Sequence, residues 1–164
     1  MGPRRPRISR AASASSREEC RKRAFRLLSI RSRSREELRR ALELRGHESG
    51  AIAETLDSLE RGGLLNDQAA LEAFLLDRED RFGKERLRHE LRRRGFPAES
   101  IDRALAEISE DDERALAETL LRRRWDELSK LSPEKRKKRV FDFLNRRGFP
   151  TSLIFDLLGE EGDS

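Results

Sequence analysis

The chain has 164 residues, of which 42% are charged and only 35% hydrophobic, so its apolar content is low for a single spherical core. Cys20 is the only cysteine, which excludes an intrachain disulfide, and no apolar run reaches membrane-spanning length. Disorder throughout is excluded because the apolar residues recur at helical spacing. These features predict a cytoplasmic protein with a thin core.

Positive charge is concentrated near the N-terminus. Residues 1–35 contain 12 basic and 2 acidic side chains, whereas the remaining residues contain 25 basic and 30 acidic ones. We expect residues 1–16 to form a disordered basic arm that lacks the apolar segment of a secretory signal. Such an arm suits contact with phosphate or with an acidic protein face, and it is equally typical of a solubilising tail.

Helix start and stop signals follow one another along the chain. Ser16 with Glu19 and Ser34 with Glu37 have the spacing of a capping box, in which the serine and the acid each accept from a free backbone N–H. Further N-cap candidates are Asn66, Ser109 and Ser132, and Pro133 suits a first helical position. Three apolar-periodic runs each end in an arginine followed by a glycine, which is typical of a helix C-terminus. These glycines are Gly46, Gly95 and Gly148.

The chain aligns with itself on these three glycines. A leucine lies four residues before each glycine and an isoleucine six residues after it: Leu42, Leu91 and Leu144, then Ile52, Ile101 and Ile154. Agreement at apolar and glycine positions together indicates a tandem repeat, with stops too frequent for a long coiled coil. We predict an all-α protein of three tandem three-helix repeats in an elongated, curved body. The predicted bounds are 17–65, 66–108 and 109–158, with an acidic tail at 159–164.

The motif "RRGFP" occurs at residues 93–97 and 146–150 and is interpreted as a helix–turn–helix corner. An arginine precedes each glycine, at Arg45, Arg94 and Arg147. A cation near a helix C-terminus stabilises it by about 0.3–1 kcal/mol, so we expect a structural role for these arginines. Each proline of "GFP" then begins the next helix.

The chain resembles the RecX family of bacterial regulators of the RecA recombinase. The resemblance rests on "SREELRRALELRG" (34–46), "LERGGLLND" (59–67), "FGKERLRHELRRRGFP" (82–97) and "LSPEKRKKRVFDFLNRRGFPTSLI" (131–154), in the order of the family. It covers residues 17–158. His47 departs from the aromatic or aliphatic residue of the family, and Gly50 is unusual early in a helix. Both departures weaken the first corner locally.

The resemblance implies binding in the groove of the RecA filament on single-stranded DNA. It implies that the chain limits filament growth, ATP hydrolysis, strand exchange and co-protease activity, as a monomer without a cofactor. The alternative is a helical-repeat protein that binds DNA independently of sequence and competes for single-stranded DNA. The sequence itself is compatible with binding to a filament, because a long, charged, repeating body suits the groove of a helical polymer.

Catalysis is not predicted from these residues. His47 and His89 are far apart in sequence and lack metal-ligand spacing, and the glycines form no phosphate-binding loop. The acidic pairs Glu36–Glu37 and Glu110–Glu113 lie where first helical turns favour acids. Trp125, after three arginines, is a possible stacking platform for a base, although packing is the preferred interpretation.

Basic residues on two predicted helices form the candidate binding site. We expect them to anchor the chain electrostatically across adjacent recombinase subunits, and solvated helix faces are the alternative explanation. The six candidates are Arg88, Arg92 and Arg93 in the second repeat and Lys137, Lys138 and Arg146 in the third.

Overall fold

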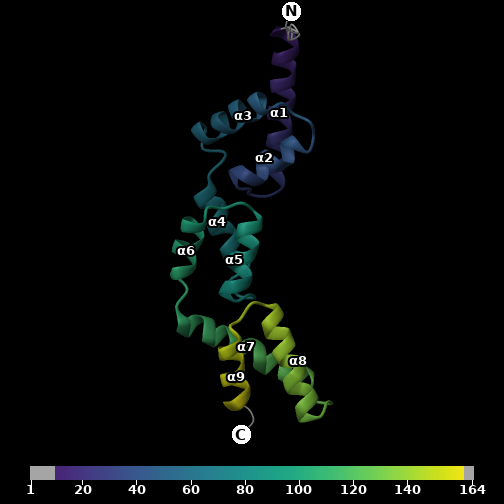
Figure 1. Ribbon diagram of the computed structural model, residues 1–164, viewed down its shortest axis with the longest axis vertical. Helices are drawn as coiled ribbons and strands as arrows, with labels where there is room; N and C mark the ends of the chain where they lie inside the picture. The colour runs from purple at the N-terminus through teal and green to yellow at the C-terminus, as the bar shows by residue number, and fades with distance from the viewer. Residues whose placement is uncertain (1–9, 161–164) are drawn as a thin grey trace, which may run out of the picture. The chain divides into compact units, whose positions relative to one another are not determined.

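The computed structural model describes residues 10–160, and gives side-chain surroundings from Ser16 onward. All regular structure in this range is helical, as predicted (Figure 1). The helices are α1 (Arg10–Ile30), α2 (Arg35–Glu43), α3 (Ser49–Arg61), α4 (Asp67–Leu76), α5 (Lys84–Arg93), α6 (Ala98–Ala106), α7 (Glu110–Glu127), α8 (Pro133–Arg146) and α9 (Thr151–Glu160).

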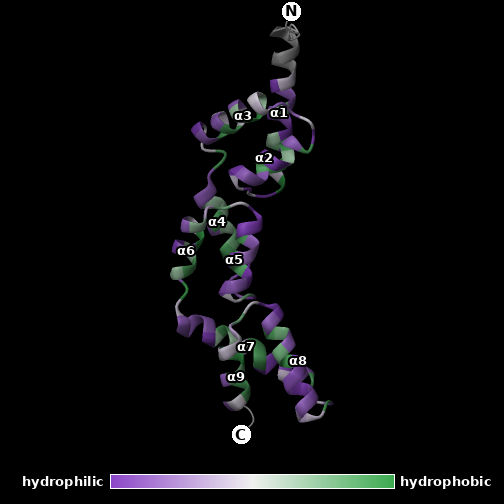
Figure 2. Cartoon of the chain, viewed as in Figure 1, coloured by the Kyte–Doolittle hydropathy of each residue, from purple (hydrophilic) through white to green (hydrophobic). Residues whose placement is uncertain are grey.

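The described residues fall into two compact units, one ending at Ala70 and one beginning at Leu71. In the first unit, α1, α2 and α3 enclose a core that includes Cys20, Leu38, Leu42 and Ile52. In the second unit, α7, α8 and α9 enclose an equivalent core. Hydrophobic and hydrophilic residues alternate along the helices (Figure 2). The three-helix repeat predicted from the glycine alignment is therefore present at both ends of the described chain.

Three of the predicted helix caps are confirmed. Ser34 forms a complete capping box with Glu37, and the Ser109 hydroxyl accepts from the Asp112 backbone N–H. The Asn66 side chain accepts from the Ala69 N–H at 3.0 Å. Ser132 occupies the N-cap of α8 without a side-chain bond, and Pro133 follows at the first helical position.

The predicted cap at Ser16 is wrong, because α1 begins six residues earlier, at Arg10. An alanine- and serine-rich stretch that contains no glycine or proline continues the helix through this position. The predicted arm thus overlaps α1 over residues 10–16, and its residues 1–9 lie outside the described range. The predicted acidic tail overlaps α9 at residues 159–160, and residues 161–164 lie outside the described range.

The three glycine corners share one geometry. Gly46, Gly95 and Gly148 have φ angles of 78°, 79° and 82°, in the left-handed region that favours glycine. In each corner, the N–H of the residue after the glycine donates to the carbonyl of the leucine that lies four residues before the glycine, as in a Schellman motif. Phe96 and Phe149 follow the second and third glycines and are buried. His47 in the first corner is only half-buried, in line with its departure from the motif.

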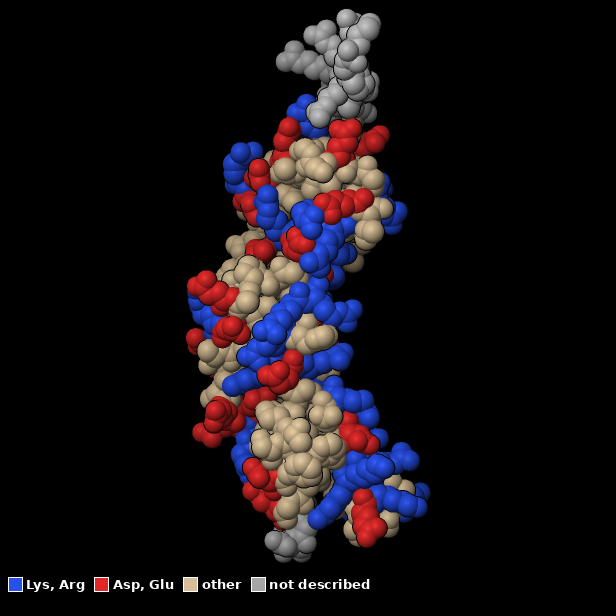
Figure 3. Space-filling view, viewed as in Figure 1, with Lys and Arg blue, Asp and Glu red and all other residues tan. Residues whose placement is uncertain are grey.

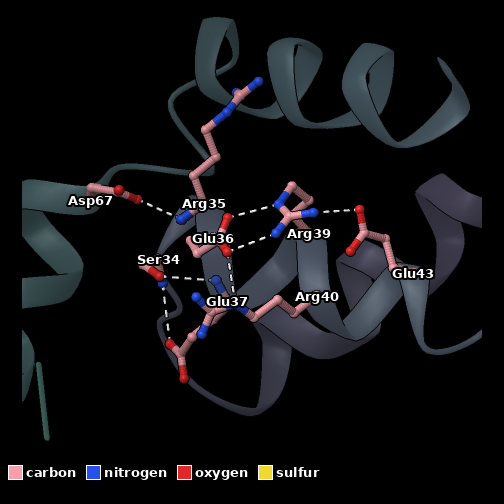
Figure 4. A network of polar contacts seen from close by, with 8 residues as sticks. All are labelled: Ser34, Arg35, Glu36, Glu37, Arg39, Arg40, Glu43 and Asp67. Atoms are coloured by element: carbon pink, nitrogen blue, oxygen red, sulfur yellow. Dashed lines mark hydrogen bonds and ion pairs between the residues drawn. The ribbon is translucent and has the colours of Figure 1, made fainter. Parts of the chain in front are cut away.

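The second helix of two repeats is capped by an acid from the start of the next repeat. The Arg35 N–H at the start of α2 donates to the Asp67 carboxylate at 2.6 Å (Figure 4). The Lys84 N–H at the start of α5 donates to the buried Glu113 carboxylate at 2.8 Å. Arg35 and Lys84 each lie eleven residues before their corner glycine, so the cap is part of the repeat. The α8 helix instead begins with proline, which has no N–H to satisfy.

The third corner packs against the start of α5. The Gly83 N–H donates to the Arg147 carbonyl at 2.9 Å, and the Arg147 guanidinium donates to the Arg81 carbonyl at 2.9 Å. A Cβ on Gly83 would lie 2.4 Å from the Gly148 carbonyl oxygen, closer than real contacts allow. Burial lowers the pKa of Arg147, which is consistent with this enclosed position. The predicted structural role of this arginine is therefore confirmed.

An ion-pair network covers the outer face of α2 (Figure 4). Glu36 accepts from both Arg39 and Arg40 at 2.7 Å, and Arg39 also contacts Glu43. The hydrogen bond from Arg39, followed by that from Arg40, lowers the pKa of Glu36 from 4.5 to about 2. The arginine charges of this helix are thus used within the chain.

We predict that Gly83→Ala destabilises the second unit by about 1–3 kcal/mol through the clash with Gly148. Its φ of −71° suits any residue, so backbone strain does not contribute. Gly159→Ala in α9 is the control, because nothing lies within 4 Å of its added Cβ, and we expect it to be neutral or slightly stabilising. Urea unfolding followed by Trp125 fluorescence measures both. Equal midpoints for the two variants would contradict the tight contact.

We predict that Glu36 stabilises the fold in a pH-dependent manner. Because its folded pKa is below the ordinary value, the stabilisation is fully present above about pH 4.5 and is lost as the pH falls toward 2. The gap in unfolding free energy between the parent and Glu36→Gln should therefore shrink over this range. Far-UV circular dichroism during denaturation measures it, with the exposed Glu19→Gln as control. A gap that stays constant or widens on acidification would contradict the lowered pKa of Glu36.

Candidate partner-binding surface

Many basic side chains in the described part of the chain are paired with acids of the same chain. Arg35 pairs with Asp57 and Glu60, and Arg86 pairs with Glu90. Exposed pairs of this kind contribute about 0–1 kcal/mol each and leave little net charge for a partner. The number of basic residues therefore does not locate a binding site by itself.

Helix α8 differs from the others. Five of its cations form no ion pair or hydrogen bond through their side chains with any described residue: Lys135, Lys137, Lys138, Arg139 and Arg146. Four of these are exposed, and Lys137 is half-buried. Figure 3 shows Lys and Arg side chains gathered over α8, at the lower right of the view. The unpaired positive charge of the second unit is thus concentrated on one helix.

A groove of about 540 Å³ runs along this charged face. Arg124 near the end of α7 and Leu131 in the following loop line it from one side. From α8 it is lined by Lys135, Lys138, Arg139, Asp142 and Arg146. Five cations and a single carboxylate therefore face one shared space, and their summed field attracts an extended anion. We call this the α7–α8 groove.

The structure brings together only two of the six predicted site residues. Lys138 and Arg146 line the α7–α8 groove, whereas Lys137 does not. Arg92 and Arg93 are exposed on α5. Arg88 is occupied within the chain, because it pairs with Glu85 at 2.6 Å and with Asp102 at 3.4 Å.

Sequence reasoning did not select Lys135, Arg139 or Arg124 as site residues. The first two follow from helical spacing, because positions 135, 138, 139, 142 and 146 share one face of α8. The opposite face carries the buried Val140 and Leu144. Arg124 comes from another helix, and only the packing of α7 on α8 places it at the groove.

One basic residue of this region serves the fold instead. Arg136 donates to the carbonyls of Leu128 and Ser129, and its guanidinium lies 4.8 Å from the centre of the Trp125 ring. Trp125 itself is half-buried and packs against the core of the third repeat. The interpretation of Trp125 as a packing residue is therefore confirmed, and its ring is not open as a platform.

Other classes of site are not seen among the described residues. His89 is exposed, and residues 16–160 contain no group of three or more potential metal ligands. No helix between residues 10 and 160 is long and apolar enough to cross a membrane. The α7–α8 groove is thus the feature on which a functional assignment rests.

Comparison with known proteins identifies relatives of the whole repeat array. Residues 20–59 match the family model for the first three-helix domain of RecX, and residues 110–158 match that for the third. The regulatory protein RecX of Amycolatopsis mediterranei is 34% identical over 139 residues, which cover 84% of this chain and 79% of that protein. The regulatory protein RecX of Corynebacterium efficiens is 36% identical over 152 residues, which cover 88% of this chain and 72% of that protein.

The fold has a counterpart among solved structures. The crystal structure of RecX from Lactobacillus salivarius superposes with a TM-score of 0.72, covering 90% of this chain and 97% of that one at 20% identity. That likeness supports the tandem three-helix fold. The identity shared with the two regulatory proteins over most of their length shows the family. The chain belongs to the RecX family of regulatory proteins.

Proposed function

We propose that this chain is a negative regulator of the RecA recombinase that binds the RecA filament on single-stranded DNA. In this role it limits filament growth, and with it ATP hydrolysis, strand exchange and co-protease activity. The carrying observation is the row of unpaired cations along the α7–α8 groove. Binding alone suffices for this regulation, so the proposal needs neither catalytic residues nor a cofactor, and it has the protein act as a cytoplasmic monomer.

The energetics of α8 support a binding role for these cations. Lys135 lies in the first turn, where the helix dipole favours acids. The first turn of α8 contains a single acid, Glu134, whereas that of α2 contains two and that of α7 contains four. Lys135 also faces Lys138 and Arg139 at spacings where like charges repel. Because this arrangement lowers the stability of the helix, its charges are better explained by a partner than by the fold.

The six residues predicted from sequence contribute unequally to the proposed anchoring. Lys138 and Arg146 act in the groove, and Arg92 and Arg93 add charge on α5. Lys137 is half-buried and lies outside the groove. Arg88 is the weakest member, because a partner would have to displace Glu85 and Asp102 from it. We add Lys135 and Arg139 to the anchoring set on the basis of the groove.

The test is ATP hydrolysis by RecA on single-stranded DNA while the protein is titrated in. We expect the intact chain to inhibit at concentrations too low to coat the bare DNA. A triple variant, Lys138→Glu with Arg139→Glu and Arg146→Glu, should raise the half-inhibitory concentration about tenfold or more, because three contacts become repulsive.

A matched variant separates location from net charge. Three exposed arginines of the first unit form no side-chain ion pair or hydrogen bond with any described residue: Arg26, Arg45 and Arg61. Reversing these three charges changes the net charge equally, and we expect inhibition to remain near that of the parent. Equal loss in both triple variants would refute the assignment to α8. Inhibition that follows occupancy of bare DNA would instead favour the competing DNA-binding protein.

A second prediction concerns stability. Lys135→Glu should raise the unfolding free energy by about 0.5–1 kcal/mol, because it places an acid in the first turn and allows a capping box with Ser132. Lys130→Glu, in the exposed loop before α8, is the control and should have little effect on stability. Urea denaturation followed by Trp125 fluorescence gives both values. Destabilisation by Lys135→Glu would mean that Lys135 supports the fold.

A further inference from the structure

We propose that the α8–α9 face of the third repeat binds single-stranded nucleic acid through both its phosphates and its bases. The phosphates lie along the unpaired cations of α8, and an unstacked base lies on the ring of Phe155. This inference rests on the proposed function and deepens it, because it names the component of the filament that this face contacts.

The aromatic part is a pair of rings on neighbouring helices. Phe155 of α9 is 62% exposed, although burial of such a side chain would stabilise the fold by about 1.5–3 kcal/mol. Its ring centre lies 5.1 Å from that of the half-buried Phe141 of α8, with the planes tilted by 39°. Phe141 packs against the core of the third repeat and supports Phe155 from behind. The outer ring is therefore held in place while much of it faces solvent.

Cations border this aromatic pair. Lys137 and Lys138 lie four and three residues before Phe141, so they are its neighbours on the helix surface. Figure 3 shows an uncharged area over α9 beside the Lys and Arg side chains of α8, and Figure 2 shows the hydrophobic residues of α9. From Lys135 to Arg146 the cations extend over about 16 Å of helix, at a rise of about 1.5 Å per residue. A chain of several phosphates can follow this row.

The combination favours a single strand over other anions. Proteins that bind single strands without sequence preference join a basic groove to aromatic rings on which bases stack. A duplex keeps its bases stacked inside and offers no free base to Phe155. An acidic peptide would match the cations, but it lacks the regularly spaced bases that can stack on an exposed phenylalanine ring. Trp125 does not fill this role, because Arg136 lies over its ring.

Fluorescence anisotropy with two labelled oligonucleotides of equal length tests the inference. One is oligothymidylate, and the other is an abasic strand that keeps the phosphates and lacks the bases. Stacking contributes about 1–3 kcal/mol per base, so we expect the parent to bind oligothymidylate about 5- to 100-fold more tightly than the abasic strand.

Variants assign this preference to one ring. Phe155→Ala should remove the preference and leave the affinity for the abasic strand unchanged, whereas Phe155→Trp should keep it. Phe25→Ala is the control, because Phe25 is a partly exposed aromatic residue on α1 in the other unit. Phe155 is largely exposed, so its replacement leaves the core intact, and far-UV circular dichroism verifies this. The cation triple variant should weaken binding to both strands and flatten the dependence on salt.

Three outcomes would overturn the inference: equal affinity of the parent for both strands, unchanged preference in Phe155→Ala, or competition by polyglutamate as effective as that by oligothymidylate. The result is separable from the proposed function. The inference fails alone if Phe155→Ala keeps the base preference while the cation triple variant no longer inhibits ATP hydrolysis by RecA. The proposed function fails alone if the base preference follows Phe155 while the intact chain leaves RecA activity unchanged.

Discussion

The left-handed glycine corner is the constraint on which the repeat depends. A residue with a Cβ at φ near +80° loses about 1–2 kcal/mol in this conformation, so glycine is required where one helix must stop and the chain must turn back. The corner also places a side chain under the helix that it ends, and Phe96 and Phe149 fill that position with buried rings. In the third corner the same glycine has a second use, because a Cβ on Gly148 would lie only 2.3 Å from the backbone nitrogen of Arg86 in α5. One backbone geometry thus sets both the shape of a repeat and its packing on the preceding one.

Charge is divided between two uses in this chain. On α2 the arginines are consumed by Glu36 and Glu43, and the network has no charge left over for a partner. On α8 the cations have no such partners among the described residues, and the helix accepts an unfavourable charge in its first turn. The contrast explains why a protein with a modest net charge of +5 can still present a strongly basic surface. Pairing, rather than composition, determines where that surface lies.

Much of the fold was predictable because the signals are local. Helix ends at Ser34, Asn66 and Ser109 depend on residues three positions apart, and the corner glycines depend on one backbone angle. The start of α1 was not predictable from Ser16, because a serine within a good helix-forming stretch has the same spacing as a cap. The binding surface was predictable only in part. Lys138 and Arg146 share a helical face in the sequence, but the pairing of Arg88 with Asp102 and the approach of Arg124 depend on contacts between helices.

The acids that cap α2 and α5 have a consequence for the order in which the molecule matures. Each acceptor lies later in the chain than its donor, by 32 residues for Arg35 and Asp67 and by 29 for Lys84 and Glu113. On the ribosome, each of the first two repeats therefore emerges with one N–H of its second helix lacking its carboxylate acceptor, which the next repeat supplies. The dependence runs in one direction only. Synthesis from the N-terminus then completes the cap of the first repeat when the second arrives, and that of the second when the third arrives.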